Sequence, residues 1–87
     1  MYSVVEDNDQ ARILKSMIKP GDKTALHGHP ALVACAINDG SYRFATPNGQ
    51  TMEVSLEVGM AMHFPAAENE TENIGSTEGQ VILVELK

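Results

Sequence analysis

The chain has few cysteines, few aromatic residues and few positive charges. Of its 87 residues one is cysteine, none is tryptophan, and six are lysine or arginine against twelve aspartate or glutamate, giving a formal net charge of −6. The scattered basic residues form no face that would displace counterions from phosphates, which excludes nucleic acid as a partner. The same charge argues against a membrane partner, because an anionic lipid surface would repel the chain.

Long apolar runs and secretion signals are also missing. Cys35 has no second cysteine with which to form an internal disulfide, and this suits a reducing compartment. No apolar run approaches the roughly 18 residues that a membrane-spanning helix needs, and no leader of charged and then apolar residues opens the chain. We therefore expect a cytoplasmic protein with a single domain over residues 1–87.

The sequence also lacks the spacing of apolar residues that is typical of an amphipathic helix. What is present is a series of short apolar or alternating segments, each closed by turn residues such as Pro20-Gly21 and Asn38-Asp39-Gly40. This pattern predicts an all-β fold of eight or nine antiparallel strands, arranged as a sandwich or barrel. The expected strands cover residues 2–5, 11–18, 25–29, 31–37, 41–45, 50–56, 59–64 and 80–86, and the polar segment 68–73 supplies a ninth candidate.

The most informative stretch contains His27 and His29. Residues at i and i+2 of a strand point to the same face, so both imidazoles can reach one metal ion. Taken alone, a His-x-His pair is a weak signal, because most such pairs that arise by chance are exposed to solvent.

The spacing around the pair resembles the first motif of the cupin superfamily. Gly21, the two histidines and Gly40 fall in the motif's register, and Gly59 followed by Pro65 matches the start of the second motif, with Asn73 as its closing residue. The resemblance spans nearly the whole chain. It implies a jelly-roll barrel with a pocket, a homodimer, and a metal site in which His27 and His29 are ligands.

Two departures from the family motifs affect that site. The motif's glutamate falls on Val33 or Ala34, and its second-motif histidine falls on Asn69 or Glu70 according to the direction of counting. If Glu70 faces inward, it completes a set with His27 and His29 that suits one divalent ion of Fe, Mn, Ni or Zn.

In the other register the polar strand turns its amides inward. Asn69, Thr71 and Asn73 then face the pocket, and Glu68, Glu70 and Glu72 form a solvated outer stripe, as runs of like charge usually do. The sequence leaves both registers open.

Four further residues are candidates for the pocket wall. Val33 and Cys35 share the strand parity of His29, Tyr42 offers a hydrogen-bonding hydroxyl, and Met62 offers an adaptable apolar side chain. If Met62 and its neighbour Phe64 pack inward, His63 points the other way, toward solvent or a partner.

Two functions therefore remain open. By resemblance the chain is a metal-dependent enzyme such as a dioxygenase, isomerase, lyase or epimerase, with His27, His29 and Glu70 as ligands. Alternatively it is a metal-free cupin that binds a small organic molecule as a sensor or accessory protein. The loss of two motif ligands favours the second function, and the fold by itself names no substrate.

Overall fold

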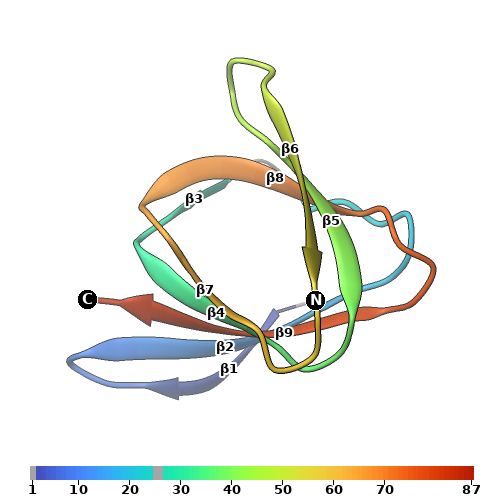
Figure 1. Ribbon diagram of the computed structural model, residues 1–87. Coiled ribbons are helices and arrows are strands. Elements are labelled where there is room, and N and C mark those ends of the chain that lie inside the picture. The colour runs from blue at the N-terminus through green and yellow to red at the C-terminus, as the bar shows by residue number, and fades with distance from the viewer. Residues whose placement is uncertain (1, 25–26) are drawn as a thin grey trace.

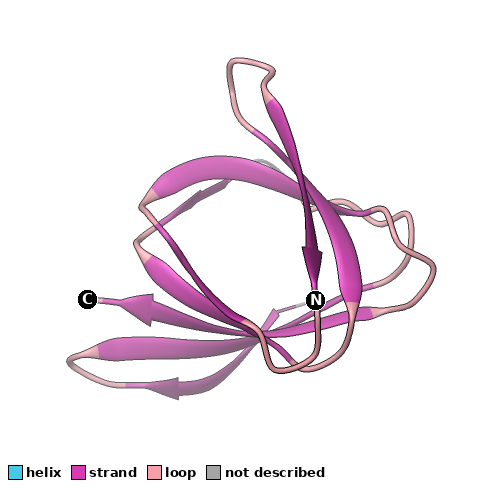
Figure 2. Cartoon of the chain, viewed as in Figure 1, coloured by secondary structure: helices cyan, strands magenta, loops and turns pink. Residues whose placement is uncertain are grey.

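A computed structural model describes residues 2–24 and 27–87, and for His27 it describes the backbone alone. The described residues form nine strands and no helix, as Figures 1 and 2 show, so none of them belongs to a helix that spans a membrane. The strands are β1 (Tyr2–Asp7), β2 (Ala11–Ile18), β3 (His27–His29), β4 (Leu32–Ala36), β5 (Gly40–Ala45), β6 (Thr51–Leu56), β7 (Ala61–Phe64), β8 (Ala67–Asn73) and β9 (Gly79–Leu86).

The strands build two antiparallel sheets that face each other. One sheet has the order β1-β2-β9-β4-β7 and the other the order β3-β8-β5-β6. Figure 1 shows the two sheets curving around a common interior, with the β5–β6 hairpin extending beyond one end. The sequence-based expectation of an all-β jelly roll with eight or nine strands is confirmed.

Strand register places the inward side chains of the five-stranded sheet in layers. One layer contains Arg12, Glu85, Leu32 and Phe64, which pair in that order across β2, β9, β4 and β7. The next layer, of Leu14, Leu83, Ala34 and Met62, is apolar, and the buried core consists of Leu32, Ala34, Ala36, Tyr42, Leu56 and Val81. The alternation of buried and half-buried residues along β4 shows that the apolar run 31–37 covers the core with one face only.

Asn73, at the end of β8, links several turns at one end of the barrel. Its side chain is 1% exposed, and its Nδ2 donates to the carbonyl oxygens of Ile18 and Thr77, each at 2.8 Å. Its Oδ1 accepts a hydrogen bond from the backbone N–H of Gly75 at 2.9 Å. One amide thus joins the end of β2, the end of β8 and the loop that leads into β9.

Tyr42 lies close to two glycines at the same end of the barrel. A Cβ at Gly79 would lie 2.0 Å from the Tyr42 Oη, and one at Gly40 would lie 2.8 Å from it. Real Cβ atoms do not approach this closely, so both positions require glycine. The Tyr42 hydroxyl is buried with no hydrogen-bond partner among the described residues, and burial raises the pKa of Tyr42.

Two other glycines are required by the backbone. Gly21 and Gly59, which open the two cupin-like motifs, have φ angles of +82° and +85°. Side chains with a Cβ rarely adopt this left-handed conformation, which explains why the motif spacing begins on glycine.

Replacing Asn73 by aspartate tests the link between the turns. A carboxylate there would face the carbonyl oxygens of Ile18 and Thr77 with no N–H to donate, so we expect Asn73→Asp to lower the free energy of unfolding by about 3 kcal/mol. Because these neighbours disfavour the charged form, the folded-state pKa of the new carboxyl rises. The loss should therefore deepen as pH increases above about 4.

Urea unfolding across this pH range measures the effect. Asn48→Asp is the matched control, because Asn48 lies in an exposed turn where its Oδ1 already acts only as an acceptor. We expect that variant to stay within about 0.5 kcal/mol of the parent. Equal stability of the two variants would contradict the role of the Asn73 amide.

The close contact at Gly79 gives a second prediction. Gly79→Ala should lower the free energy of unfolding by about 2 kcal/mol, because its Cβ overpacks the Tyr42 ring. Gly28→Ala is the control within a strand, since a Cβ there meets its nearest atom, Glu68 Cγ, at 3.6 Å and should cost little. If denaturation curves show the two variants to be equally stable, the contact does not constrain the fold.

Candidate functional site

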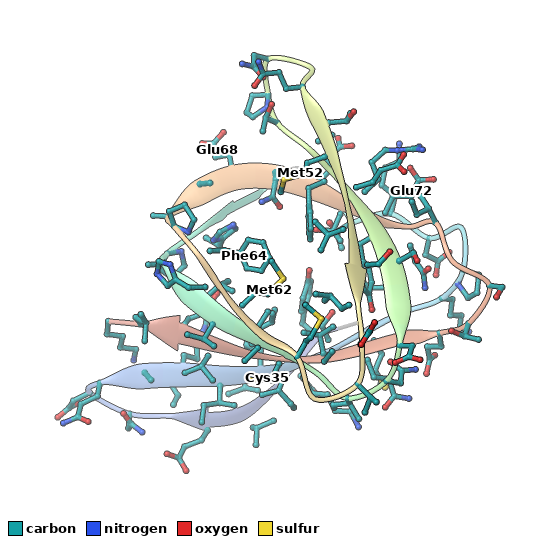
Figure 3. All side chains as sticks on the ribbon, viewed as in Figure 1. Cys35, Met52, Met62, Phe64, Glu68 and Glu72 are labelled. Atoms are coloured by element: carbon teal, nitrogen blue, oxygen red, sulfur yellow. The ribbon has the colours of Figure 1, made fainter. Side chains whose placement is uncertain are left out.

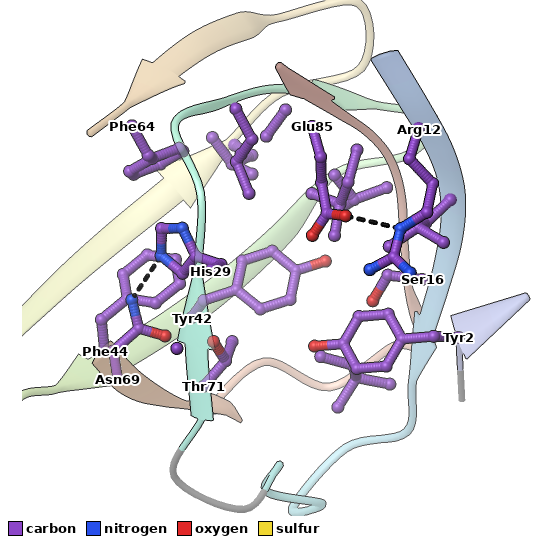
Figure 4. A pocket seen from close by; sticks show the side chains of 18 of the residues that line it. Tyr2, Arg12, Ser16, His29, Tyr42, Phe44, Phe64, Asn69, Thr71 and Glu85 are labelled. Atoms are coloured by element: carbon purple, nitrogen blue, oxygen red, sulfur yellow. Dashed lines mark hydrogen bonds and ion pairs between the residues drawn. The ribbon is translucent and has the colours of Figure 1, made fainter. Parts of the chain in front are cut away.

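A cavity of about 370 Å³ lies between the two sheets. Most of its surface is aliphatic or aromatic, and its polar groups gather in two places that Figure 4 shows on opposite sides. The lining consists of Tyr2, Val4, Arg12, Leu14, Ser16, Ile18, Gly28, His29, Leu32, Ala34, Tyr42, Phe44, Leu56, Phe64, Asn69, Thr71, Val81, Leu83 and Glu85.

The first polar group is the pair of His29 and Asn69, on β3 and β8. The Pro30 carbonyl can only accept a hydrogen bond, so the His29 Nδ1 that lies 2.7 Å from it donates its proton. The neutral ring then has an acceptor at Nε2, and Asn69 Nδ2 donates to it at 3.1 Å, as the dashed line in Figure 4 shows. Both nitrogens of His29 are thus engaged by the protein.

His27 lies two residues before His29 on β3. Its backbone pairs with Asn69 in the β3–β8 register, and its side chain lies outside the described residues. The expectation that it acts as a metal ligand therefore stays a prediction.

Glu70 does not lie with the two histidine positions. Asn69 and Thr71 line the cavity from β8, whereas Glu70 is absent from that lining and has the opposite strand parity. Its neighbour of like parity, Glu72, has its Oε1 3.7 Å from the Arg43 Nη1 on the outer surface. The observed register of β8 is therefore the one that turns Asn69 and Thr71 inward. The expectation that Glu70 faces the pocket as a third metal ligand is wrong.

Val33 and Cys35 also lie elsewhere than expected. On β4 the buried, cavity-lining residues are Leu32 and Ala34, so Val33 and Cys35 face the other side of the sheet. The reason is the corner at Pro30, where the chain passes from β3 in one sheet to β4 in the other. The alternation of inward and outward side chains on β3 therefore does not continue into β4, and counting from His29 gives the wrong face for Val33 and Cys35.

The remaining candidates lie on β5 and β7. Tyr42 lines the cavity, whereas Met62 packs against the core cluster without lining the cavity. Figure 3 labels Met62 and Phe64 within the barrel. His63, between them, is exposed and pairs with Val33 in the register of the outer face.

A second polar group in the cavity was not anticipated from the sequence. Arg12 Nε donates to Glu85 Oε1 at 2.8 Å across the β2–β9 ladder, although the Glu85 side chain is only 10% exposed. Ser16, 4% exposed, lies on the same strand as Arg12. The only available signal was the isolated glutamate in the otherwise apolar run 81–86, because the pairing depends on register between distant strands.

Tyr2 adds its phenol to this second group, as Figure 4 shows. Burial raises the pKa of Tyr2, hydrogen bonds with Thr24 and Ser16 act in the opposite direction, and the charge of Glu85 adds to the rise. The phenol therefore stays neutral at physiological pH.

A second hollow, of about 310 Å³, adjoins the cavity. It shares His29, Asn69, Phe44 and Phe64 with the cavity, so these four side chains separate the two spaces. The two phenylalanine rings are in contact, with centroids 5.7 Å apart and an interplanar angle of 58°. The aromatic pair and the histidine–amide pair thus bound the cavity on this side.

The side chains that the structure describes do not by themselves form the divalent-metal site that the cupin resemblance implies. No group of three His, Cys, Asp or Glu side chains within the described part of the chain is placed to hold a metal ion. His29 Nε2 accepts the Asn69 amide, and neither Val33 nor Ala34 offers an oxygen where the motif has glutamate. Imidazole and carboxylate ligands are what Fe, Mn, Ni and Zn require.

Solved structures similar to this one cover the whole chain. A cupin domain from Bordetella pertussis Tohama I has a TM-score of 0.91 and 25% identity, and the match covers 100% of this chain and 92% of that one. A conserved protein with a double-stranded β-helix domain from Klebsiella pneumoniae MGH 78578 has a TM-score of 0.79 and 21% identity, over 99% and 75% of the two chains.

A third structure extends the likeness at lower identity. A cupin-2 domain protein from Shewanella frigidimarina NCIMB 400 has a TM-score of 0.69 and 13% identity, over 100% of this chain and 80% of that one. No family model and no curated protein matches the sequence. The likeness to known cupin domains extends over the entire barrel and agrees with the motif glycines, the His-x-His strand and the closing asparagine: the chain has the cupin fold, and these neighbours support its assignment to the cupin superfamily.

Proposed function

We propose that this cupin binds one small, largely apolar organic molecule inside its barrel and needs no metal ion to do so. The observation that carries the proposal is the cavity of about 370 Å³, with its aliphatic and aromatic wall and its two separate polar groups. Binding sites for small molecules typically have this character, with few polar groups that fix the orientation of an apolar body.

The apolar part of the wall supports this function. Leu14, Leu83 and Ala34 form one layer of the five-stranded sheet, and Phe44 lines the cavity from the opposite sheet. A flat or aliphatic body between these side chains would remove apolar surface from water, which contributes about 25 cal/mol per Å² before the costs of association.

The His29–Asn69 pair supports independence from metal. The lone pair of His29 Nε2 accepts a hydrogen bond from Asn69 Nδ2 at 3.1 Å. Because a metal ion would need the same lone pair, metal binding at this nitrogen would require that hydrogen bond to break. The pair instead orients both side chains at the cavity wall. Asn69 Oδ1 is then available to accept a hydrogen bond from a bound molecule.

Filling the cavity tests the binding function. Ala34→Leu adds methyl groups inside the cavity, and Val33→Leu adds one methylene on the opposite face of the same strand. We expect the first variant to weaken binding of 2-acetylnaphthalene, a neutral bicyclic probe, by about tenfold, and the second to leave it unchanged.

The measurement is an NMR titration of the full chain, with thermal unfolding to show that both variants fold. In the parent, amide shifts should move at residues of the cavity lining. Equal affinity of both variants, or shifts confined to the outer faces of the sheets, would contradict binding in the barrel.

Metal content gives an independent prediction. Untagged protein supplied with Fe, Mn, Ni and Zn should bind well below one equivalent of any of them by elemental analysis, and chelation should leave probe affinity unchanged. One equivalent of metal that is lost in both His27→Ala and His29→Ala would instead support the metal-dependent function.

A further inference from the structure

The Arg12–Glu85 pair is an ionic group placed in an apolar layer of the cavity wall. It shares its cross-strand layer with Leu32 and Phe64, and Glu85 is 8% exposed. The Arg12 side chain is 43% exposed, so the pair is half-buried: the cost of desolvating the Glu85 carboxylate and the screening of Arg12 by solvent both reduce its net contribution to stability. The stability of the barrel therefore does not explain why this layer carries charges.

The geometry of the pair leaves hydrogen-bonding capacity unused. The bond of 2.8 Å joins Nε to Oε1, and no bond joins either Arg12 Nη or Glu85 Oε2 to another described residue. Both residues line the cavity, and Figure 4 draws the second Glu85 oxygen on the side of Tyr42 and the end of the guanidinium on the side of Ser16. The wall thus presents N–H donors and a carboxylate acceptor side by side.

We infer that Arg12 and Glu85 together recognise a neutral group that carries a hydrogen-bond donor and an acceptor next to each other, such as a carboxamide or lactam. The carbonyl oxygen of that group accepts from an Arg12 Nη, and its N–H donates to Glu85 Oε2. This inference rests on the proposed function, since it names the class of molecule that the cavity binds.

The charges of Arg12 and Glu85 are the reason that we expect the bound group to be neutral. The pair has no net charge, so a carboxylate beside Arg12 would also meet the carboxylate of Glu85, and an ammonium beside Glu85 would meet Arg12. The chain as a whole carries a net charge of −6, which further disfavours an anion. A neutral amide meets both partners without either repulsion.

Three probes of nearly equal shape separate these possibilities. Naphthalene-2-carboxamide has both a donor and an acceptor, 2-acetylnaphthalene has only the acceptor, and naphthalene-2-carboxylate is an anion. We expect the full-length parent to bind the amide about tenfold more tightly than the ketone, and the carboxylate most weakly. The measurement is isothermal titration, with NMR shifts to locate each probe.

Two variants assign the preference to the pair. Glu85→Gln removes the carboxylate and leaves Arg12 unpaired, so the carboxylate probe should gain at least about tenfold over the amide. Arg12→Met combined with Glu85→Leu removes both charges, and its affinities for the amide and the ketone should become equal.

The control is the double variant Arg43→Met with Glu53→Leu. It removes an exposed ion pair of 2.8 Å on the outer surface and should keep the preference of the parent. Thermal unfolding shows whether Glu85→Gln folds. If it does not, the affinities of the Arg12→Met, Glu85→Leu double variant alone test whether the pair causes the amide preference.

The outcomes distinguish the two proposals. If no probe shifts the cavity residues of the parent, both the binding function and the inference fail. If the ketone or the carboxylate binds the parent as tightly as the amide, or the double variant keeps the amide preference, the inference fails and the binding function stands.

Discussion

The barrel depends on one buried amide. Asn73 holds the end of β2 and the loop before β9 to its own strand through three hydrogen bonds, and no other described side chain is as fully buried. A carboxamide suits this position because it donates two hydrogen bonds and accepts another without charge. The registers that follow from this junction bring β2, β9 and β4 together in one sheet, and thereby place the cavity between the sheets.

The sequence predicted the strands well because turn residues and alternation are local signals. Residues 11–18 match β2 at both ends, and the polar segment 68–73 proved to be the strand β8. It predicted the cavity wall poorly because side-chain direction depends on how the strands meet. Parity counted from His29 fails at the Pro30 corner, where the chain changes sheets, and so Val33 and Cys35 lie outside the cavity. For β8 the sequence allowed two registers, and only the pairing of Phe44 with Thr71 decides between them.

One position of the cupin-like metal motif takes part in a hydrogen-bonded pair. Where the motif has a second histidine this chain has Asn69 or Glu70, and Asn69 donates to the Nε2 of His29. The strand that presents His29 is kept, as are the glycines that allow the turns on either side of it. In the proposed metal-free function, the barrel uses these positions for hydrogen bonding. Such a change alters the function of a fold without altering its framework.

The position of β1 has a further consequence. This strand pairs with β2 alone, and all six of its residues are exposed, yet Tyr2 and Val4 form part of the cavity wall. Local stability varies within a protein, and an edge strand with one neighbour opens more easily than the centre of a sheet. The pairing of β1 with β2 is separate from the ladders that join β2, β9 and β4, so these core layers do not depend on it. Part of the cavity wall thus belongs to an edge strand of its sheet, and most of the rest belongs to strands that pair on both sides or lie in the opposite sheet.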